Sequence, residues 1–251
     1  TASGIYKSNP DRIWKEPGGK NLSMYILALE TTGAHASVAI IDEKGTVFEK
    51  RSEEVLNHLQ SLLPMVKELL EENKLQLDDM TAIAASKGPG SFTGIRIGVS
   101  SARALAQALG RKTIGVPTLK AFAYNMPDYD GLICPVFDAR RSQVYAGAYR
   151  WNEGKIEEAV KGAPYAIEDF LKEAERAGEK RMFFGDGIRA YEGFFEREII
   201  APEAARFQSA ASVARLAKDM LEAGLETDYE ELMPDYMRKA EAERRLEEKK
   251  K

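Results

Sequence analysis

A loop rich in glycine and proline restricts the possible folds of this chain more than any other stretch. It runs from Lys87 to Gly98, with the sequence KGPGSFTGIRIG, and joins an apolar run at 82–86 to an alanine-rich segment at 93–109. Glycine and proline at this density favour a tight turn, so the pattern predicts a strand followed at once by a helix. The free N–H groups of such a helix start can bind an anion, and a turn that binds nothing fits the pattern equally well. The spacing matches neither the dinucleotide fingerprint nor the P-loop.

The order of apolar and helical segments repeats along the chain. The first set is predicted as strands 25–30, 37–41 and 46–48, helix 53–72, strand 82–86 and helix 93–109. The second set is predicted as strands 131–137, 143–149 and 155–160, helix 167–177, strand 181–184 and helix 210–223. Two similar halves predict one duplicated α/β fold.

Composition narrows the class of protein. The chain has 251 residues with a net charge of −4, which argues against a protein that grips a phosphate backbone by itself. Its one cysteine, Cys134, rules out an internal disulfide and a multi-cysteine zinc site. No apolar run is long enough to span a bilayer, and no signal peptide is recognisable ahead of Met24, so we expect a cytoplasmic protein.

Three motifs carry a resemblance to a known family. They are Gly-Pro-Gly-Ser-Phe-Thr-Gly-Ile-Arg in the loop, Leu-Glu-Thr-Thr at 29–32, and Asp-Ala-Arg at 138–140. Together they resemble the TsaB (YeaZ) family over residues 24–243. Members of that family are accessory subunits of the bacterial machinery that makes threonylcarbamoyladenosine in tRNA.

The resemblance implies a role and a set of partners. The chain would be a non-catalytic subunit that binds and stabilises TsaD, the subunit that transfers the threonylcarbamoyl group to the adenosine beside the anticodon. A TsaE-family ATPase would act on the complex, the chain would form a homodimer when alone, and tRNA would be reached only through the complex. No cofactor, metal or membrane partner is expected.

The duplicated pattern also resembles the superfold of acetate and sugar kinases, heat-shock ATPases and actin (ASKHA), in which nucleotide lies between two lobes. We expect an N-terminal lobe at 24–125 with the partner-binding helices, and a C-terminal lobe at 126–237 whose last helix is able to pack back on the first lobe. Residues 1–23 are expected to be a cloning remnant or a disordered extension, and 238–251 a charged tail.

Surplus apolar stripes on the first two long helices predict a helical interface with another subunit. One stripe of the first helix can face its own sheet, and the other needs a neighbour unless both are buried within the chain. Small residues every four positions on the second helix permit close helix approach. The predicted interface residues are Leu56, Leu59, Leu63, Ile95, Gly98, Val99, Ala102 and Ala106.

The superfold implies positions for a vestigial nucleotide cleft, and these are Glu30, Thr31, Gly33, Gly88, Gly90, Asp138, Gly185 and Gly187. The turn 138–141 contains no glycine, so backbone amides there would be held away from a phosphate, although its arginines could reach one. By resemblance, Thr118 and Phe122 stand where TsaD has its histidine ligands, and the chain's only histidines are His35 and His58. An ATP-dependent small-molecule kinase and a metal-dependent endopeptidase of the same superfold remain the alternatives.

Overall fold

A computed structural model describes residues 24–55 and 57–237 of the chain. Predictions about residues 1–23, Leu56 and residues 238–251 lie outside the described residues. The chain divides into two compact units. The first holds the described residues up to Lys87, together with Thr93–Val116 and Ser209–Met233, and the second holds Gly88–Phe92, Pro117–Gln208 and the described residues from Pro234 onward. The lobe limits expected from the sequence stay a prediction, because compactness alone does not show which segments fold independently.

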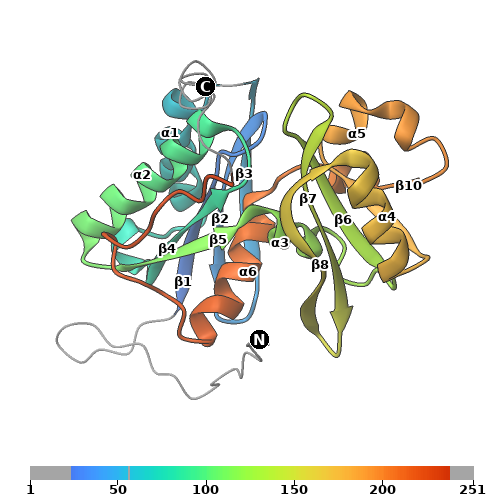
Figure 1. Ribbon diagram of the computed structural model, residues 1–251. Coiled ribbons are helices and arrows are strands. Elements are labelled where there is room, and N and C mark those ends of the chain that lie inside the picture. Colours follow the sequence, from blue (N-terminus) through green and yellow to red (C-terminus); the bar gives the residue numbers. More distant parts are fainter. Residues whose placement is uncertain (1–23, 56, 238–251) are drawn as a thin grey trace. The chain divides into compact units, whose positions relative to one another are not determined.

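The first unit is built on a five-stranded sheet of order β3-β2-β1-β4-β5. Its strands are β1 (Tyr25–Glu30), β2 (His35–Asp42), β3 (Val47–Val55), β4 (Ala82–Gly88) and β5 (Lys112–Pro117). Strand β1 runs antiparallel to β2 and parallel to β4. The helices of this unit are α1 (His58–Glu72), the short η1 (Leu77–Asp79), α2 (Phe92–Leu109) and α6 (Ala210–Glu222), and α6 packs on β1, β2 and β3 (Figure 1).

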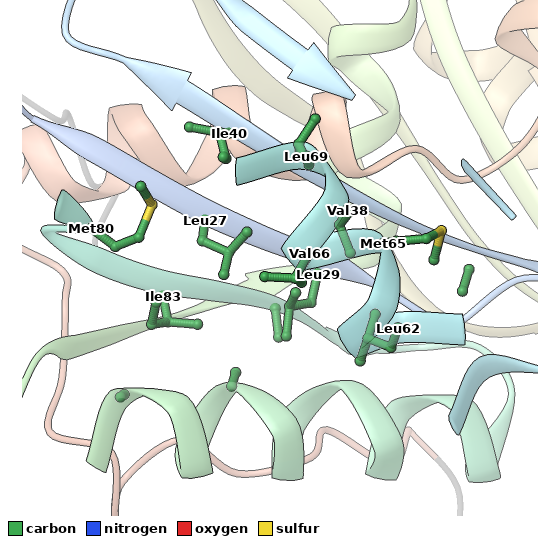
Figure 2. Packing of buried hydrophobic residues seen from close by; sticks show 14 of the residues in the cluster. Leu27, Leu29, Val38, Ile40, Leu62, Met65, Val66, Leu69, Met80 and Ile83 are labelled. Atoms are coloured by element: carbon green, nitrogen blue, oxygen red, sulfur yellow. The ribbon is translucent and has the colours of Figure 1, made fainter. Parts of the chain in front are cut away.

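The core of the first unit lies between the sheet and the helices α1 and α2. Strand residues alternate faces and α1 contributes apolar residues three and four positions apart, so both elements present one apolar side to the same layer. Figure 2 shows the labelled side chains of this layer, which are Leu27, Leu29, Val38, Ile40, Leu62, Met65, Val66, Leu69, Met80 and Ile83. Their burial fixes how α1 can lie on the sheet.

The second unit repeats the same sheet order, now as β8-β7-β6-β9-β10. Its strands are β6 (Leu132–Asp138), β7 (Gln143–Asn152), β8 (Lys155–Ala166), β9 (Arg181–Phe184) and β10 (Ile199–Ile200). Its helices are α3 (Thr118–Ala121), η2 (Phe122–Asn125), α4 (Ile167–Ala177), α5 (Gly187–Ala190), η3 (Glu192–Phe194) and η4 (Glu203–Ala205). Strand β6 runs antiparallel to β7 and parallel to β9, as β1 does to β2 and β4. The repeat confirms the predicted duplicated α/β fold of the ASKHA type.

The first unit differs from the sequence prediction in two places. Residues 53–55 are not helical, because β3 continues to Val55 in register with β2, and α1 begins only at His58. The strand β5 was not predicted at all. Its sequence, KTIGVP, is short and carries both glycine and proline, which are unfavourable in strands, yet it pairs at the edge of the sheet where proline is tolerated.

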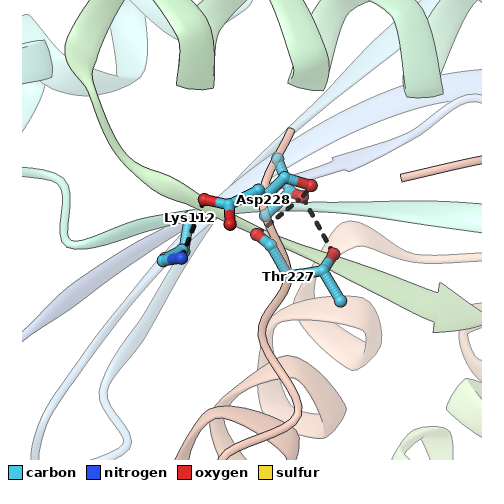
Figure 3. Close-up of polar contacts among 4 residues, drawn as sticks. Lys112, Thr227 and Asp228 are labelled. Atoms are coloured by element: carbon cyan, nitrogen blue, oxygen red, sulfur yellow. Dashed lines mark hydrogen bonds and ion pairs between the residues drawn. The ribbon is translucent and has the colours of Figure 1, made fainter. Parts of the chain in front are cut away.

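A C-terminal segment covers the outer edge of β5. Thr113 and Thr227 exchange backbone hydrogen bonds, with N···O distances of 2.8 and 2.9 Å. The Lys112 ammonium lies 2.7 Å from the Asp228 carboxylate, as Figure 3 shows. A few residues further on, Leu232 is buried in the core of the unit. The segment therefore satisfies part of an edge that would otherwise present unpaired backbone groups.

Among the described residues, no helix has the length and apolar character needed to cross a membrane.

Candidate functional site

The carboxyl group of Glu30 is buried at the end of β1 and is bonded on both oxygens. Thr32 donates to Oε1 through its backbone N–H at 2.5 Å and its hydroxyl at 2.6 Å. Ser86, on β4, donates its hydroxyl to Oε2. Burial raises the pKa of Glu30, and the bonds from Ser86 and Thr32 oppose that rise. The carboxyl group thus holds the turn 31–34 to β4 through donors of its own chain.

Thr31 joins the same turn to helix α2. Its hydroxyl donates to the Gly94 carbonyl at 2.7 Å, in the first turn of the helix. A Cβ atom at Gly98 would lie 2.5 Å from that hydroxyl oxygen, so only glycine allows this approach. The structure therefore brings together Glu30, Thr31 and Gly98. In the loop ahead of the helix, Gly88 and Gly90 have φ angles of 122° and 156°.

A histidine pair flanks the turn on the side of α1. His58 is buried, and its Nε2 atom lies 3.0 Å from the Gly33 carbonyl oxygen. His35 places Nδ1 3.0 Å from the Ser52 carbonyl oxygen. Burial lowers the pKa of His58. The sequence pattern did not predict the contact between His58 and Gly33, because these residues lie 25 positions apart.

The second unit carries a strained turn between β6 and β7. Arg140, Arg141 and Ser142 have φ angles of 63°, 55° and 58°, which is unusual for three consecutive residues other than glycine. The Asp138 carboxylate accepts from the Arg140 N–H at 2.7 Å and from the Tyr191 hydroxyl at 2.8 Å. These bonds hold the turn in place.

The glycines after β9 pack closely against β6. A Cβ atom at Gly185, where φ is 95°, would lie 2.3 Å from the Val136 carbonyl oxygen, and one at Gly187 would lie 2.9 Å from it. Between them, Asp186 accepts from the Asp138 N–H at 3.2 Å. Asp138, Gly185 and Gly187 therefore belong to one cluster in the second unit, whereas Glu30, Thr31 and Gly33 cluster in the first. Binding of a nucleotide by either cluster stays a prediction.

The predicted partner surface is only partly accessible. On α1, the side chains of Leu59 and Leu63 are 73% and 54% exposed, and Val55 at the end of β3 is 61% exposed. The α2 residues of the prediction are all buried in the first unit, and they are Ile95, Gly98, Val99, Ala102 and Ala106. The small residues among them, Gly98, Ala102 and Ala106, let α2 approach its own sheet and turn. This part of the predicted surface is therefore corrected, because these side chains are not accessible to a partner. Leu56 lies outside the described residues.

The two positions that correspond by resemblance to the histidine ligands of TsaD are also buried. Thr118 and Phe122 are buried in the second unit, and the Thr118 hydroxyl has no hydrogen-bond partner within the described part of the chain. Across residues 24–55 and 57–237, no group of three or more histidine, cysteine, aspartate or glutamate side chains is placed to hold a metal ion.

Comparisons with known proteins bear on the family of this chain. Residues 50–246 match the family model described as "TsaD: tRNA N6-adenosine threonylcarbamoyltransferase". The "tRNA threonylcarbamoyladenosine biosynthesis protein TsaB" of Bacillus subtilis is 33% identical over 88% of this chain and 96% of its own length. The protein of the same name from Escherichia coli is 38% identical over 53% of this chain and 58% of its own length.

Solved structures give the same result. "YeaZ from Pseudomonas aeruginosa" is 29% identical, with a TM-score of 0.72 over 85% of this chain and 99% of that one. A second crystal structure, of "an uncharacterized protein with similarity to peptidase YEAZ from Pseudomonas aeruginosa", is also 29% identical, with a TM-score of 0.76 over 86% of this chain and 100% of that one. Because a relative at 33% identity is matched over nearly its whole length, this chain belongs to the TsaB (YeaZ) family.

Proposed function

We propose that this chain is the non-catalytic partner subunit of the complex that forms threonylcarbamoyladenosine beside the anticodon of tRNA. In that role it binds and stabilises a TsaD-family catalytic subunit. The membership of the chain in the TsaB family supports its assignment to the biosynthesis of threonylcarbamoyladenosine in tRNA. The single observation that carries the partner role is a pair of large apolar side chains left exposed one turn apart on α1, namely Leu59 and Leu63. We call these two residues the α1 face.

Ion pairs on α1 show which flank of the helix carries this face. The Lys50 ammonium of β3 lies 2.9 Å from Glu68 and 2.5 Å from Glu72, so the flank with these two glutamates points toward β3. Successive helical residues are about 100° apart around the axis, which puts Leu59 and Leu63 on the opposite flank. That flank is not covered by β3. It offers the partner an apolar strip along the length of one helical turn.

The energetics fit a protein partner. Complete burial of the two exposed leucines would stabilise a complex by about 2–4 kcal/mol, after allowance for the surface that each already hides. Side chains of this size are normally buried, and several of them together mark an interaction site. The occupant we propose is an apolar helical surface of the TsaD-family subunit. A second copy of this chain would use the same face when no TsaD-family subunit is present, so homodimer and heterodimer would exclude one another.

The remaining partners rest on family resemblance alone. We propose that a TsaE-family ATPase acts on the complex, that tRNA is contacted only through it, and that the complex works in the cytoplasm. The sequence has a net charge of −4, which gives an isolated chain little attraction for a phosphate backbone.

Substitution within the α1 face tests the proposal. Leu63→Glu puts a charge into an apolar contact and should weaken the affinity for a TsaD-family subunit by about tenfold to a hundredfold in calorimetric titration. Thr46→Glu is the matched control, because it adds the same charge at an exposed turn residue between β2 and β3, outside the α1 face. An unchanged affinity for Leu63→Glu, with an unchanged circular dichroism spectrum, would place the interface elsewhere.

A further inference from the structure

The first residue of α1 points inward while the next one points out. His58 is buried, and Leu59 is the more exposed of the two residues in the α1 face. The Nε2 atom of His58 lies 3.0 Å from the Gly33 carbonyl oxygen in the turn 31–34. A carbonyl oxygen can only accept, so Nε2 carries the hydrogen of the neutral ring. This bond is a direct link between the turn and the start of α1.

The surroundings of the ring oppose its protonation. With the hydrogen on Nε2, the second proton would have to go to Nδ1, which is buried and has no hydrogen-bond partner among the described residues. The first turn of α1 contains no acidic side chain. The start of a helix is the positive end of its dipole, which disfavours a cation. The titratable group that acts on His58 from the neighbouring strand β2 is His35, and its electrostatic effect also lowers the pKa of His58.

We propose that His58 is a positioning residue for partner binding, because its neutral ring ties the first turn of α1 to the Gly33 carbonyl and so holds Leu59 and Leu63 in the orientation that a partner needs. This inference rests on the proposed function of the α1 face. It adds that the face depends on pH and on the turn 31–34, which Glu30 and Thr31 hold from the other side.

The direction of the pH effect follows from the protonation states. A ring released into water takes up a proton near its ordinary pKa of about 6.5, whereas the tied ring resists it. Acidification therefore favours the released form, by up to about tenfold for each pH unit below that value. Burial lowers the pKa of His58 in the fold, which likewise means that acidification favours the released ring. We expect partner affinity to fall between pH 7.5 and pH 5.5.

Three variants separate this effect from others. His58→Gln keeps an N–H donor that can reach the Gly33 carbonyl but cannot titrate, so its partner affinity should stay within about twofold of the wild type at pH 7.5 and should not fall at pH 5.5. His58→Ala loses the link and should bind about five- to tenfold more weakly at both pH values. His35→Gln is the matched control, since it removes the other histidine and should keep the pH dependence.

The experiment has two readouts on the full chain. Affinity for a purified TsaD-family subunit is measured by titration calorimetry at pH 7.5 and 5.5, and amide hydrogen exchange over residues 61–65, where every residue except Pro64 has an amide hydrogen, is measured on the isolated chain. Faster exchange in His58→Ala, but not in His58→Gln, is the expected result for the link itself. If His58→Ala fails to fold, the glutamine variant alone decides. A pH dependence that survives in His58→Gln would overturn the inference, and so would wild-type exchange and affinity in a folded His58→Ala.

The same data distinguish this inference from the proposed function. If Leu63→Glu weakens binding and the His58 variants do not, His58 has no positioning role but the α1 face stands. If Leu63→Glu leaves binding unchanged while exchange at residues 61–65 still responds to His58→Ala, the link exists but does not serve the partner. That second pattern would overturn the inference together with the proposed face.

Discussion

The hydroxyl of Thr31 occupies the space that a side chain at Gly98 would need, with only 2.5 Å between Oγ1 and the position of a Cβ atom. Because the same hydroxyl donates to the Gly94 carbonyl, it cannot turn away without losing that bond. We therefore predict that Gly98→Ala lowers the free energy of unfolding by about 1–3 kcal/mol, measured by chemical denaturation.

A double-mutant cycle checks the cause. Thr31→Ala removes the obstructing hydroxyl, so the cost of Gly98→Ala should be smaller in that background than in the wild type. Gly193→Ala serves as the control, since a Cβ atom there meets nothing within 4 Å. Additive costs at positions 31 and 98 would show that the contact does not limit the packing of α2.

Glu30→Gln should alter how stability depends on pH. Burial raises the pKa of Glu30 above its unfolded value, so the stability that its neutral form contributes is complete below that unfolded value and is lost as the pH rises through the folded value. Within that window the loss is at most about 1.4 kcal/mol per pH unit. Glutamine keeps an acceptor for Thr32, and its N–H can donate to the Ser86 hydroxyl.

Denaturation curves from pH 4.5 to pH 8 test this expectation. The difference in unfolding free energy between Glu30→Gln and the wild type should move in favour of the variant as the pH rises. A difference that is constant over that range would mean that Glu30 has the same pKa in the folded and unfolded chain.

Ala102 gives a sharp test of where α2 faces. Its side chain is fully buried in the first unit, so Ala102→Trp should overpack the core and lower the unfolding free energy by about 1–3 kcal/mol or more. Leu63→Glu, at an exposed position, should leave the unfolding free energy within about 0.5 kcal/mol of the wild type. If Ala102→Trp unfolds like the wild type and only loses partner binding, α2 would be presenting its small residues outward.

The sequence predicted the fold well where the spacing of apolar residues and the residue types at the ends of an element indicate the same structure. The strand 25–30 and the helix 167–177 are present with the predicted bounds, because each has a clear apolar pattern. The glycine loop before α2 is present because glycine and proline favour a turn. The end of β3 was missed because residues 53–55 suit a helix locally and are held in a strand by pairing with β2. Local propensity cannot show such pairing.

The candidate site was predicted less completely. A row of small residues on a helix lets another backbone come close, but the pattern is the same whether that backbone belongs to a partner or to the chain itself. At Gly98 the neighbour is Thr31 of the same unit. The contact between His58 and Gly33 joins distant parts of the sequence, and no motif in the sequence predicts it.

The central claim is that this chain assists transfer without performing it. The most direct measurement is threonylcarbamoyl transfer to tRNA, supplied with threonylcarbamoyl adenylate, by a TsaD-family subunit with and without this chain, together with the chain alone. We predict no transfer by the chain alone, and transfer by the TsaD-family subunit that increases when the wild-type chain is added but much less when Leu63→Glu is added. Transfer by the isolated chain that is abolished by Glu30→Ala would contradict the account, as would a TsaD-family subunit whose activity the chain does not change.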